Sequence, residues 1–580
     1  MDGVSGKILS INLSEKTVQI LSPPESLYKK YIGGKGLAGY YLKPYVRHSW
    51  DSPHMPLLFM TGPLVNTASP TSGRMTIMSR SPLTGTVGDT SVGGKLGIQL
   101  KRAGWDGVII TGKSESLCGI SIDHSKVEFV DAQHLAGLHI SQAARLLPPD
   151  GAHALTGPAA DNGVYFANIA VGTHSFSGRN GLGLSMAAKK LKYLWVKGNN
   201  KTTVYSREIL KKAREEIYRL AAASSVIKGG MGLSELGTGA LFDLINHRRM
   251  IPVKNFKKTY FSDGNKVNAW QYKQKYKTKS TGCAGCHILC KKKGSDKSIM
   301  PEYETMSHFS ALLENNDTDV VVEANRICNE LGMDTISAAA TLGCYAEIHK
   351  IHLKPVDILR LLKNIGLSKG VGNELKLGSF LYAQMQGASH VSMSVKGLEM
   401  PAYDPRGAYG MALAYATSTR GACHLRAYPI SHEILRKPVA TDRFSFSGKA
   451  RIIKLNEDMN AVIDSLTACK FIFFGASLEE YAQALYGVTG IETSAQELLT
   501  IGERIYFNER IMNYMNGFTI KDDCLPERFF LESGTSGDGL IVDPINKEDF
   551  TETLFHYYQI RGIALSGKPE PSKAEELDLI

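Results

Sequence analysis

Three cysteines in one short segment constrain this chain more than any other feature of it. The segment TGCAGCHILCK, residues 281–291, places Cys283, Cys286 and Cys290 at C-x2-C-x3-C spacing in a 580-residue sequence with nine cysteines. Such spacing lets three thiolates in a loop point at one iron–sulfur cluster, which then needs a fourth ligand. A zinc site completed by His287 and a loop without metal remain open as alternatives. Radical enzymes that cleave S-adenosylmethionine use the reverse order, C-x3-C-x2-C, so the spacing argues against them.

Composition indicates an ordinary globular protein. Hydrophobic residues make up 43% of the chain and charged residues 21%, and the formal net charge is +11. This charge would suit nucleic acid, an anionic membrane or an acidic redox partner, but the basic residues are scattered and accompany no nucleic-acid motif. We therefore predict no nucleic-acid partner. The first residues lack the pattern of a signal peptide, and no stretch of eighteen apolar residues occurs. We expect a cytoplasmic protein without membrane contact.

The first third of the chain is rich in glycine and alternates in the manner of strands. The clearest strand-like segments are 7–13, 108–110 and 193–196. We therefore expect a sheet-rich domain over residues 1–200.

Helical periodicity dominates the rest of the chain. Apolar residues recur every three or four positions over 209–223, 320–331 and 335–352. A later stripe, formed by Leu455, Met459, Val462, Ile463 and Leu466, runs into Cys469. The fold class that we predict is α+β, with mainly helical domains over 201–400 and 401–580 after the sheet-rich domain. The last fifteen residues are charged, and we expect them to be loosely held.

Several glycine-rich segments resemble anion-binding loops. They lie around Arg74, around Ser91 and Gly93, and around Arg179 and Asn180. Glycine lets backbone amides approach phosphate oxygens, and arginine adds bidentate charge. Each segment taken singly also fits an ordinary turn. None has the strand, G-x-G-x-x-G, helix order of a dinucleotide site.

Motifs along the whole chain resemble those of the tungsten-containing aldehyde:ferredoxin oxidoreductase family. The matching segments are YIGGKGL (31–37), SPLTG (81–85), GRNGLG (178–183), PEYET (301–305), CNELGMDTIS (328–337), PAYDPRGAYGMALAYATSTRGACHLRA (401–427) and GERIYFNERIMNYMNGFTIKDDCLPER (502–528). The resemblance implies a tungsten (or molybdenum) ion held by two pterins, with a 4Fe-4S cluster nearby. The sheet-rich domain would then bind the metal–pterin cofactor.

The resemblance also assigns the cofactor residues. Cys283, Cys286, Cys290 and Cys469 would bind the cluster. Arg74, Ser91, Gly93, Arg179 and Asn180 match residues that hold the pterin phosphates or a bridging Mg²⁺ ion, and Arg426 would face the pterin. Two copies of a pterin motif would supply Asn329, Gly332, Met333 and Asp334, and Asp464, Ala468 and Cys469. The second copy departs from the family pattern D-x-x-G-L-C, because Thr467 and Ala468 replace Gly and Leu.

Two residues match the catalytic positions of the family. His424 would lie beside the metal, where an imidazole with a pKa near the working pH can accept a proton. Glu304, preferred over Glu302 by its spacing from the thiols, would be the acidic partner. The implied reaction oxidises an aldehyde to a carboxylic acid.

The same resemblance suggests partners, and alternative functions within and outside the family stay open. Ferredoxin or a separate iron–sulfur subunit would take the electrons, and a homodimer is an expected oligomeric state. The alternative functions are reduction of an aromatic thioester ring, a partner-dependent active subunit, and a non-catalytic electron-relay, metal-binding or zinc-bearing subunit.

Overall fold

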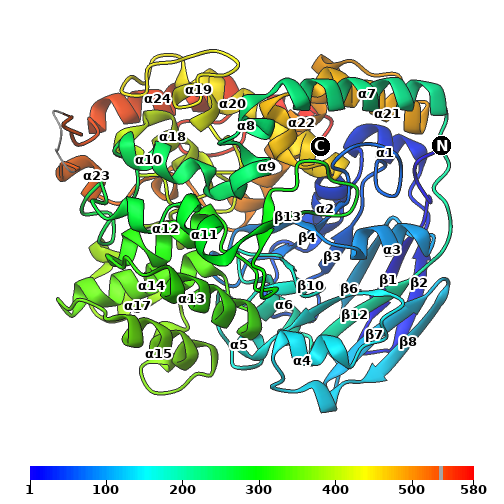
Figure 1. Ribbon diagram of the computed structural model, residues 1–580. Helices are drawn as coiled ribbons and strands as arrows, with labels where there is room; N and C mark the ends of the chain where they lie inside the picture. The colour runs from blue at the N-terminus through cyan, green and yellow to red at the C-terminus, as the bar shows by residue number, and fades with distance from the viewer. Residues whose placement is uncertain (535–539) are drawn as a thin grey trace.

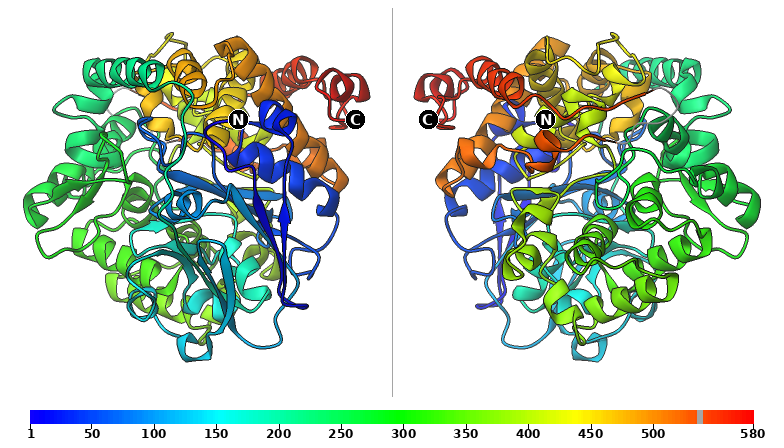
Figure 2. Two further views of the ribbon diagram at one scale, coloured as in Figure 1. Left: turned by 90° about the vertical axis from the view of Figure 1, so that its right-hand side faces the viewer. Right: turned by 90° about the vertical axis from the view of Figure 1, so that its left-hand side faces the viewer.

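The protein is an α+β structure, as predicted, with a sheet-rich N-terminal part followed by a mainly helical remainder. The computed structural model describes residues 1–534 and 540–580. Figure 1 shows the strands of the N-terminal part, in blue and cyan, grouped together. The green middle part and the yellow-to-red C-terminal part are mainly helical (Figures 1 and 2).

The N-terminal part contains two six-stranded sheets. The first has the order β2-β1-β6-β3-β4-β5, with bounds Thr17–Leu21, Ile8–Asn12, Gly107–Thr111, Leu57–Met60, Arg74–Arg80 and Val87–Gly93. The second has the order β11-β10-β9-β12-β7-β8, with bounds Ser175–Phe176, Ile169–Val171, Ala152–Thr156, Leu191–Lys197, Cys118–Asp123 and Lys126–Asp131. The strands predicted over 7–13, 108–110 and 193–196 are therefore confirmed as β1, β6 and β12.

One hydrophobic core joins the two sheets. Alternate residues of β1 and β6 on one side and of β7 and β12 on the other are buried in it, such as Ile11, Ile110, Ile122 and Val196. This follows from the period of two along a strand, which places every second side chain on the same face. The helices α3 (Leu96–Arg102) and α6 (Leu182–Ala188) contact both sheets. This rigid base supports the loops that follow β4, β5 and β11.

The helices predicted from periodicity are present with small differences at their ends. They are α7 (Arg207–Ala223), α13 (Thr318–Leu331), α14 (Thr335–Ile348) and α20 (Lys449–Leu466). In α20 the predicted stripe is wrong at one position, because Leu455 is 50% exposed whereas Val462, Ile463 and Leu466 are fully buried. Helix α14 ends before the predicted residue 352, at Ile348.

The end of α20 packs directly on the N-terminal part. A Cβ atom at Gly34, in α2 (Gly34–Leu42), would lie 2.5 Å from the carbonyl oxygen of Asp464. A Cβ at Gly62 would lie 2.5 Å from the carbonyl oxygen of Leu466. Only glycine allows two backbones to approach this closely. The position of Cys469, three residues beyond α20, is thereby tied to the sheet domain.

The expectation of a loose C-terminus is wrong. Residues Pro571–Glu576 form α25, and Ala574 and Leu577 are buried. The carbonyl oxygen of Leu577 accepts a hydrogen bond from Arg504 at 2.7 Å, and that of Leu579 accepts one from Lys43 at 3.0 Å. A charged C-terminal segment can therefore still pack against the protein, because its backbone carbonyls accept hydrogen bonds from basic side chains elsewhere in the chain.

Over residues 1–534 and 540–580, every helix is too short or too polar to cross a membrane.

Candidate functional site

Most of the predicted site residues line a single cavity of about 370 Å³. The lining comes from strand ends of the N-terminal part, the cysteine loop, helix α12 (Tyr303–Phe309), the start of α14 and the segment around His424. The predicted residues in it are Arg74, Ser91, Gly93, Arg179, Cys283, Cys286, Cys290, Glu304, Asn329, Met333, Asp334, His424 and Cys469. Asn180, Gly332, Arg426, Asp464 and Ala468 lie outside the lining.

The three clustered cysteines belong to a loop held by a short hairpin. Strands β13 (Lys279–Thr281) and β14 (Lys291–Lys293) pair in antiparallel fashion on either side of it. The amide of Cys286 donates a hydrogen bond to the carbonyl of Cys283 at 3.1 Å, which turns the loop back on itself. All three thiols are half-buried and free. The loop therefore presents them to the cavity while remaining close to the surface.

Cys469 reaches the same cavity from a distant part of the chain. Helix α20 ends at Thr467 in a left-handed conformation, with φ 56°, and the amide of Ala468 donates back to Ile463 at 3.0 Å. This reversal directs the next residue into the cavity. Burial raises the pKa of the Cys469 thiol to about 11, although Arg74 opposes the shift.

His287, the fourth ligand of the zinc alternative, lies outside the cavity lining. Its ring contacts Tyr218 edge-on, with 4.5 Å between ring centroids. Burial lowers the pKa of His287 to about 4. Within the described part of the chain, no three His, Cys, Asp or Glu side chains have the arrangement expected around a single metal ion.

Arg74 interacts both with the glycine-rich segment around Ser91 and Gly93 and with the thiols of the cavity. Its Nε donates to Ser91 Oγ at 2.8 Å, and its Nη2 donates to the Ser91 carbonyl at 2.5 Å. Burial opposes the charge of Arg74, but the thiols of Cys469 and Cys283 raise its pKa. A Cβ at Gly93 would lie 2.4 Å from Cys283 Sγ. Glycine at this strand end thus leaves the space that the cysteine loop occupies.

Arg179 also lines the cavity, beside Asp334. Its Nη1 donates to the Ala422 carbonyl at 2.6 Å, and its Nε, 4.0 Å from Asp334 Oδ2, has no hydrogen-bond partner. Asp334 caps α14 by accepting from the amide of Ser337 at 3.0 Å. Asn180 is fully buried and donates to the Arg420 carbonyl at 3.1 Å. The arginine head is therefore held in place but keeps one free donor.

The remaining residues of the first pterin motif surround the end of α13. Gly332 ends this helix in a left-handed conformation, with φ 78°, and its carbonyl accepts from Asn168 at 2.8 Å. Met333 pairs with Ala167 in an isolated β-bridge. Asn329 and Met333 line the cavity, whereas Gly332 makes the turn that places them there.

Arg426 and Asp464 form a buried charge cluster behind the cavity. Arg426 pairs with Asp89 and lies 3.7 Å from Asp464 Oδ2. Lys470 donates to the same Asp464 oxygen at 2.8 Å. Ala468, which precedes Cys469 in the sequence, is fully buried. The Nε of Arg426 and the Oδ1 of Asp464 have no hydrogen-bond partner.

Glu304 occupies the first turn of α12. Its Oε2 accepts a hydrogen bond from the amide of Ala402 at 2.8 Å, and its Oε1 has no hydrogen-bond partner. Burial raises the pKa of Glu304 to about 7, against the Ala402 hydrogen bond, which lowers it. Glu302 lines the same cavity but is exposed. Glu304 thus has the environment of a group that exchanges a proton near neutral pH.

His424 lies next to Glu304, with 3.5 Å between its Nε2 and Glu304 Oε1. The expectation of an imidazole pKa near the working pH is not met. Burial, followed by the charges of Arg179 and Arg420, lowers the pKa of His424 well below its ordinary value. The lowered pKa favours the neutral imidazole at pH 7, which can accept a hydrogen bond.

Sequence reasoning missed two further polar residues of the site. His308 follows Glu304 by one helical turn, and its Nδ1 lies 3.6 Å from Glu304 Oε2. The i, i+4 spacing in E-T-M-S-H was the available signal. Arg420 lines the cavity and has no comparable local signal.

Arg420 holds a buried thiol beside His424. Its Nε and Nη2 lie 3.2 and 2.9 Å from Cys423 Sγ, and the amide of Leu425 donates to the same sulfur at 3.3 Å. Burial raises the pKa of a thiol, yet the guanidinium groups of Arg420 and Arg179 outweigh it and lower the pKa of Cys423. The segment that carries His424 is thus anchored on a sulfur that accepts three donors.

Replacing Cys423 by alanine is expected to destabilise the protein by about 1–3 kcal/mol more than a plain loss of packing, because Arg420 and Leu425 lose a buried acceptor. Cys328→Ala is the matched control, since Cys328 is also fully buried but lies in an apolar core. Denaturant unfolding measures the difference. Equal losses of stability in the two variants would show that the sulfur acts only as a space filler.

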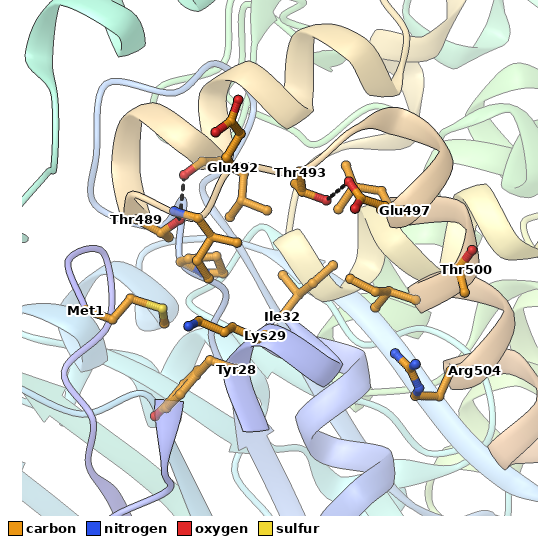
Figure 3. Close-up of a pocket in the computed structure, with 15 residues that line it drawn as sticks. Met1, Tyr28, Lys29, Ile32, Thr489, Glu492, Thr493, Glu497, Thr500 and Arg504 are labelled. Atoms are coloured by element: carbon orange, nitrogen blue, oxygen red, sulfur yellow. Dashed lines mark hydrogen bonds between the residues drawn. The ribbon is translucent and has the colours of Figure 1, made fainter. Parts of the chain in front are cut away.

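A second cavity, of about 340 Å³, lies between α1 (Glu25–Tyr31), α21 (Leu478–Thr489) and α22 (Ala495–Met515). In Figure 3, Met1 and Thr489 lie on one side of it and Thr500 and Arg504 on the other. Its described lining includes neither cysteine nor histidine. It is therefore separate from the candidate site.

Four thiols in one cavity, with a glutamate and a histidine 3.5 Å apart, are features of a redox enzyme that holds a metal cofactor beside its substrate. The comparisons with known proteins agree with this class. The family model "Aldehyde ferredoxin oxidoreductase, N-terminal domain" matches residues 8–198, and "Aldehyde ferredoxin oxidoreductase, domains 2 & 3" matches residues 209–579.

The similar proteins cover the whole chain. The tungsten-containing aldehyde ferredoxin oxidoreductase of Thermococcus kodakarensis is 35% identical over 100% of this chain and 99% of its own length. The aliphatic sulfonate oxidoreductase, WOR-like subunit, of Pyrococcus furiosus is 26% identical over 100% of this chain and 97% of its own. The chain belongs to the aldehyde ferredoxin oxidoreductase family.

A solved structure shares the fold. The active site complex BamBC of benzoyl coenzyme A reductase, in complex with 1,5-dienoyl-CoA, matches with a TM-score of 0.86 at 21% identity, over 100% of this chain and 97% of that chain. At this identity the match describes the fold alone.

Proposed function

We propose that the protein oxidises an aldehyde to a carboxylic acid, R-CHO + H2O giving R-COOH + 2 H⁺ + 2 e⁻. The observation that carries the proposal is the 3.5 Å approach of His424 Nε2 to Glu304 Oε1 in the cavity that four cysteines line. Family membership supports the reaction type. The tungsten-containing relative supports a tungsten–pterin cofactor.

The residues present fit this cofactor. Three buried polar atoms of residues that line the cavity have no hydrogen-bond partner: Nε of Arg179, Oε1 of Glu304 and Nδ1 of His424. Buried polar groups are nearly always hydrogen-bonded, so these atoms are suited to a polar group bound between them. Arg74 and Arg179, with Ser91, Gly93 and Asn180, would hold the pterin phosphates and Mg²⁺. Molybdenum in place of tungsten would use the same residues.

Each pterin motif would hold one pterin ring. Asn329, Gly332, Met333 and Asp334 form the first motif, and Asp464, Ala468 and Cys469 form the second. Arg426 would support the second pterin from behind, through its contacts with Asp89 and Asp464. Cys283, Cys286, Cys290 and Cys469 would ligate the 4Fe-4S cluster.

Glu304 and His424 would manage the protons of the reaction. When bound, the metal–pterin cofactor and the cluster supply the electron acceptor of the oxidation. Glu304 exists in both protonation states near pH 7, so its carboxylate can take a proton from the attacking water. Neutral His424 can orient the water or the carbonyl group by hydrogen bonding. We assign neither role to His308, because its ring is fully buried and its Nδ1 and Nε2 lie 2.8 and 3.2 Å from the carbonyl oxygens of Glu304 and Met400.

The proposed electron acceptor is ferredoxin or a separate iron–sulfur subunit. The half-exposed cysteine loop between β13 and β14 supports this, because electrons leaving the cluster would have a short path to the surface. Its flanking lysines would attract an acidic carrier. The cytoplasmic location, the homodimer and the boundary between two helical domains near residue 400 stay predictions.

The test combines elemental analysis of anaerobically purified protein with benzyl-viologen reduction by a panel of aldehydes. We expect about four iron atoms and about one tungsten or molybdenum atom per chain, with viologen reduced when aldehyde is present. The same metals without aldehyde oxidation would favour ring reduction or a partner-dependent subunit. Zinc alone would overturn the proposal.

A further inference from the structure

A row of aromatic side chains extends from His424 along the cavity. We call Tyr403, Tyr428, Phe471 and Phe474 the aromatic wall, and all four line the cavity that contains Glu304. The ring centroid of His424 lies 5.6 Å from that of Tyr403 and 6.1 Å from that of Tyr428. Tyr428 lies 6.0 Å from Phe474, which stacks with Phe471 at 6.2 Å. The wall therefore begins at the acid–base pair and leads away from it.

The wall is preorganised. Tyr403 is 2% exposed, and its ring meets that of Tyr428 nearly at right angles, at 86°. Their hydroxyl oxygens lie 3.2 Å apart, so that one hydroxyl group donates a hydrogen bond to the other. Tyr428 has φ 48°, a left-handed conformation that is uncommon for a bulky residue and that the fold must hold in place. These contacts fix the direction of the Tyr428 ring.

The part of the wall beyond Tyr403 keeps free ring surface. Tyr428, Phe471 and Phe474 line the cavity and are half-buried, so the rest of the chain does not enclose them completely. Aromatic rings prefer offset or edge-to-face contact with other rings, and such pairs add to the gain from burial alone. Aliphatic chains gain only the burial.

We propose that the substrates of this site are aromatic aldehydes, whose ring packs against Tyr428 and Phe474 while the carbonyl group faces Glu304 and His424. This inference rests on the proposed function. In this arrangement the reacting carbon lies next to Glu304 and His424 at one end of the aromatic wall, and the ring of the substrate lies against the middle of the wall.

A purely structural role of the wall makes a different prediction. If Tyr428 and Phe474 only excluded water from the site, shortening them would impair all aldehydes alike. If they recognise a ring, the loss falls on aromatic substrates. The ratio of kcat/KM for benzaldehyde to that for butyraldehyde separates the two roles.

The experiment uses the holoenzyme with Tyr428→Leu and Phe474→Leu. Each variant is expected to lower the benzaldehyde-to-butyraldehyde ratio of kcat/KM by about five- to tenfold, the scale of one lost aromatic pair. Tyr428→Phe should keep the ratio, because it keeps the ring. Tyr409→Leu is the matched control: Tyr409 is half-buried and edge-on to Phe444 at 6.0 Å, but lies outside the cavity. It should leave the ratio unchanged.

Binding of non-reacting analogues provides a readout that does not need turnover. Calorimetry should show that benzyl alcohol binds more tightly than 1-butanol to the unmodified holoenzyme, and that Tyr428→Leu removes the preference. Equal losses for both aldehydes and no binding preference would overturn the inference. If the unmodified enzyme oxidises no aldehyde, the proposed function fails, and the alcohol titration alone then decides whether the wall recognises a ring.

Discussion

Cys469→Ser is expected to cost the protein its iron–sulfur cluster, even though this residue is remote in sequence from the other three thiols. All four line one cavity, and Cys469 is held there by the turn after α20. A serine hydroxyl is a poor substitute for a thiolate ligand of iron. We expect a large loss of iron and of the broad absorbance near 400 nm that such clusters show, measured on anaerobically purified protein.

Cys524→Ser is the control for this variant. Cys524 is also half-buried and free, but it lies outside the cavity. Iron content and spectrum should be unchanged in it. An intact cluster in Cys469→Ser would remove this residue from the ligand set and with it the main link between the two ends of the proposed site.

Replacing Glu304 by glutamine is expected to lower kcat by about 10²- to 10⁴-fold, the range for loss of a general acid–base group. The amide keeps the size of the side chain and can still accept from Ala402, so metal content should persist. In the unmodified enzyme, activity should rise as the pH increases through about 7, where Glu304 ionises. The variant should lack this rise in its pH–rate profile.

Glu302→Gln is the matched control, since Glu302 lines the same cavity two residues earlier but is exposed. It should keep most of the activity.

Stability provides a second check on Glu304. Its folded pKa of about 7 lies above its ordinary value of 4.5, so folding takes up a proton between these values. The stability of the unmodified protein should therefore fall over this range as pH rises, and Glu304→Gln should reduce the fall. Full activity in Glu304→Gln would refute the proton-transfer role.

Local patterns in the sequence predicted the elements whose signals are local. Alternation located β1, short apolar runs located β6 and β12, and the three-to-four-residue period located α7, α13 and α20. The cysteine spacing identified a loop, and the stripe of α20 indicated that a helix leads to Cys469. Each of these signals depends on residues close together in the chain, so no knowledge of packing was needed.

Properties that depend on packing were beyond the sequence. The low pKa of His424 results from burial and from Arg179, which comes from a different domain. The exposure of Leu455 shows that an apolar stripe does not reveal how much of it is covered. The hydrogen bonds of Arg420 to Cys423, and the ring contacts of Tyr428 with Phe474, join side chains whose directions the sequence does not specify. The family pattern predicted Arg426 and Asp464 as site residues, but it did not predict that their side chains lie 3.7 Å apart.

The tight backbone contact of Gly34 and Gly62 with the end of α20 has a consequence for biosynthesis. Cys469 is positioned only after α20 has docked on the N-terminal sheets, and α20 leaves the ribosome after most of the chain has been made. A nascent chain that stops before this helix offers at most three of the four thiols. Insertion of the cluster would therefore be a late event in maturation, and the assembly machinery that delivers iron and sulfide would meet a nearly folded protein rather than an emerging one.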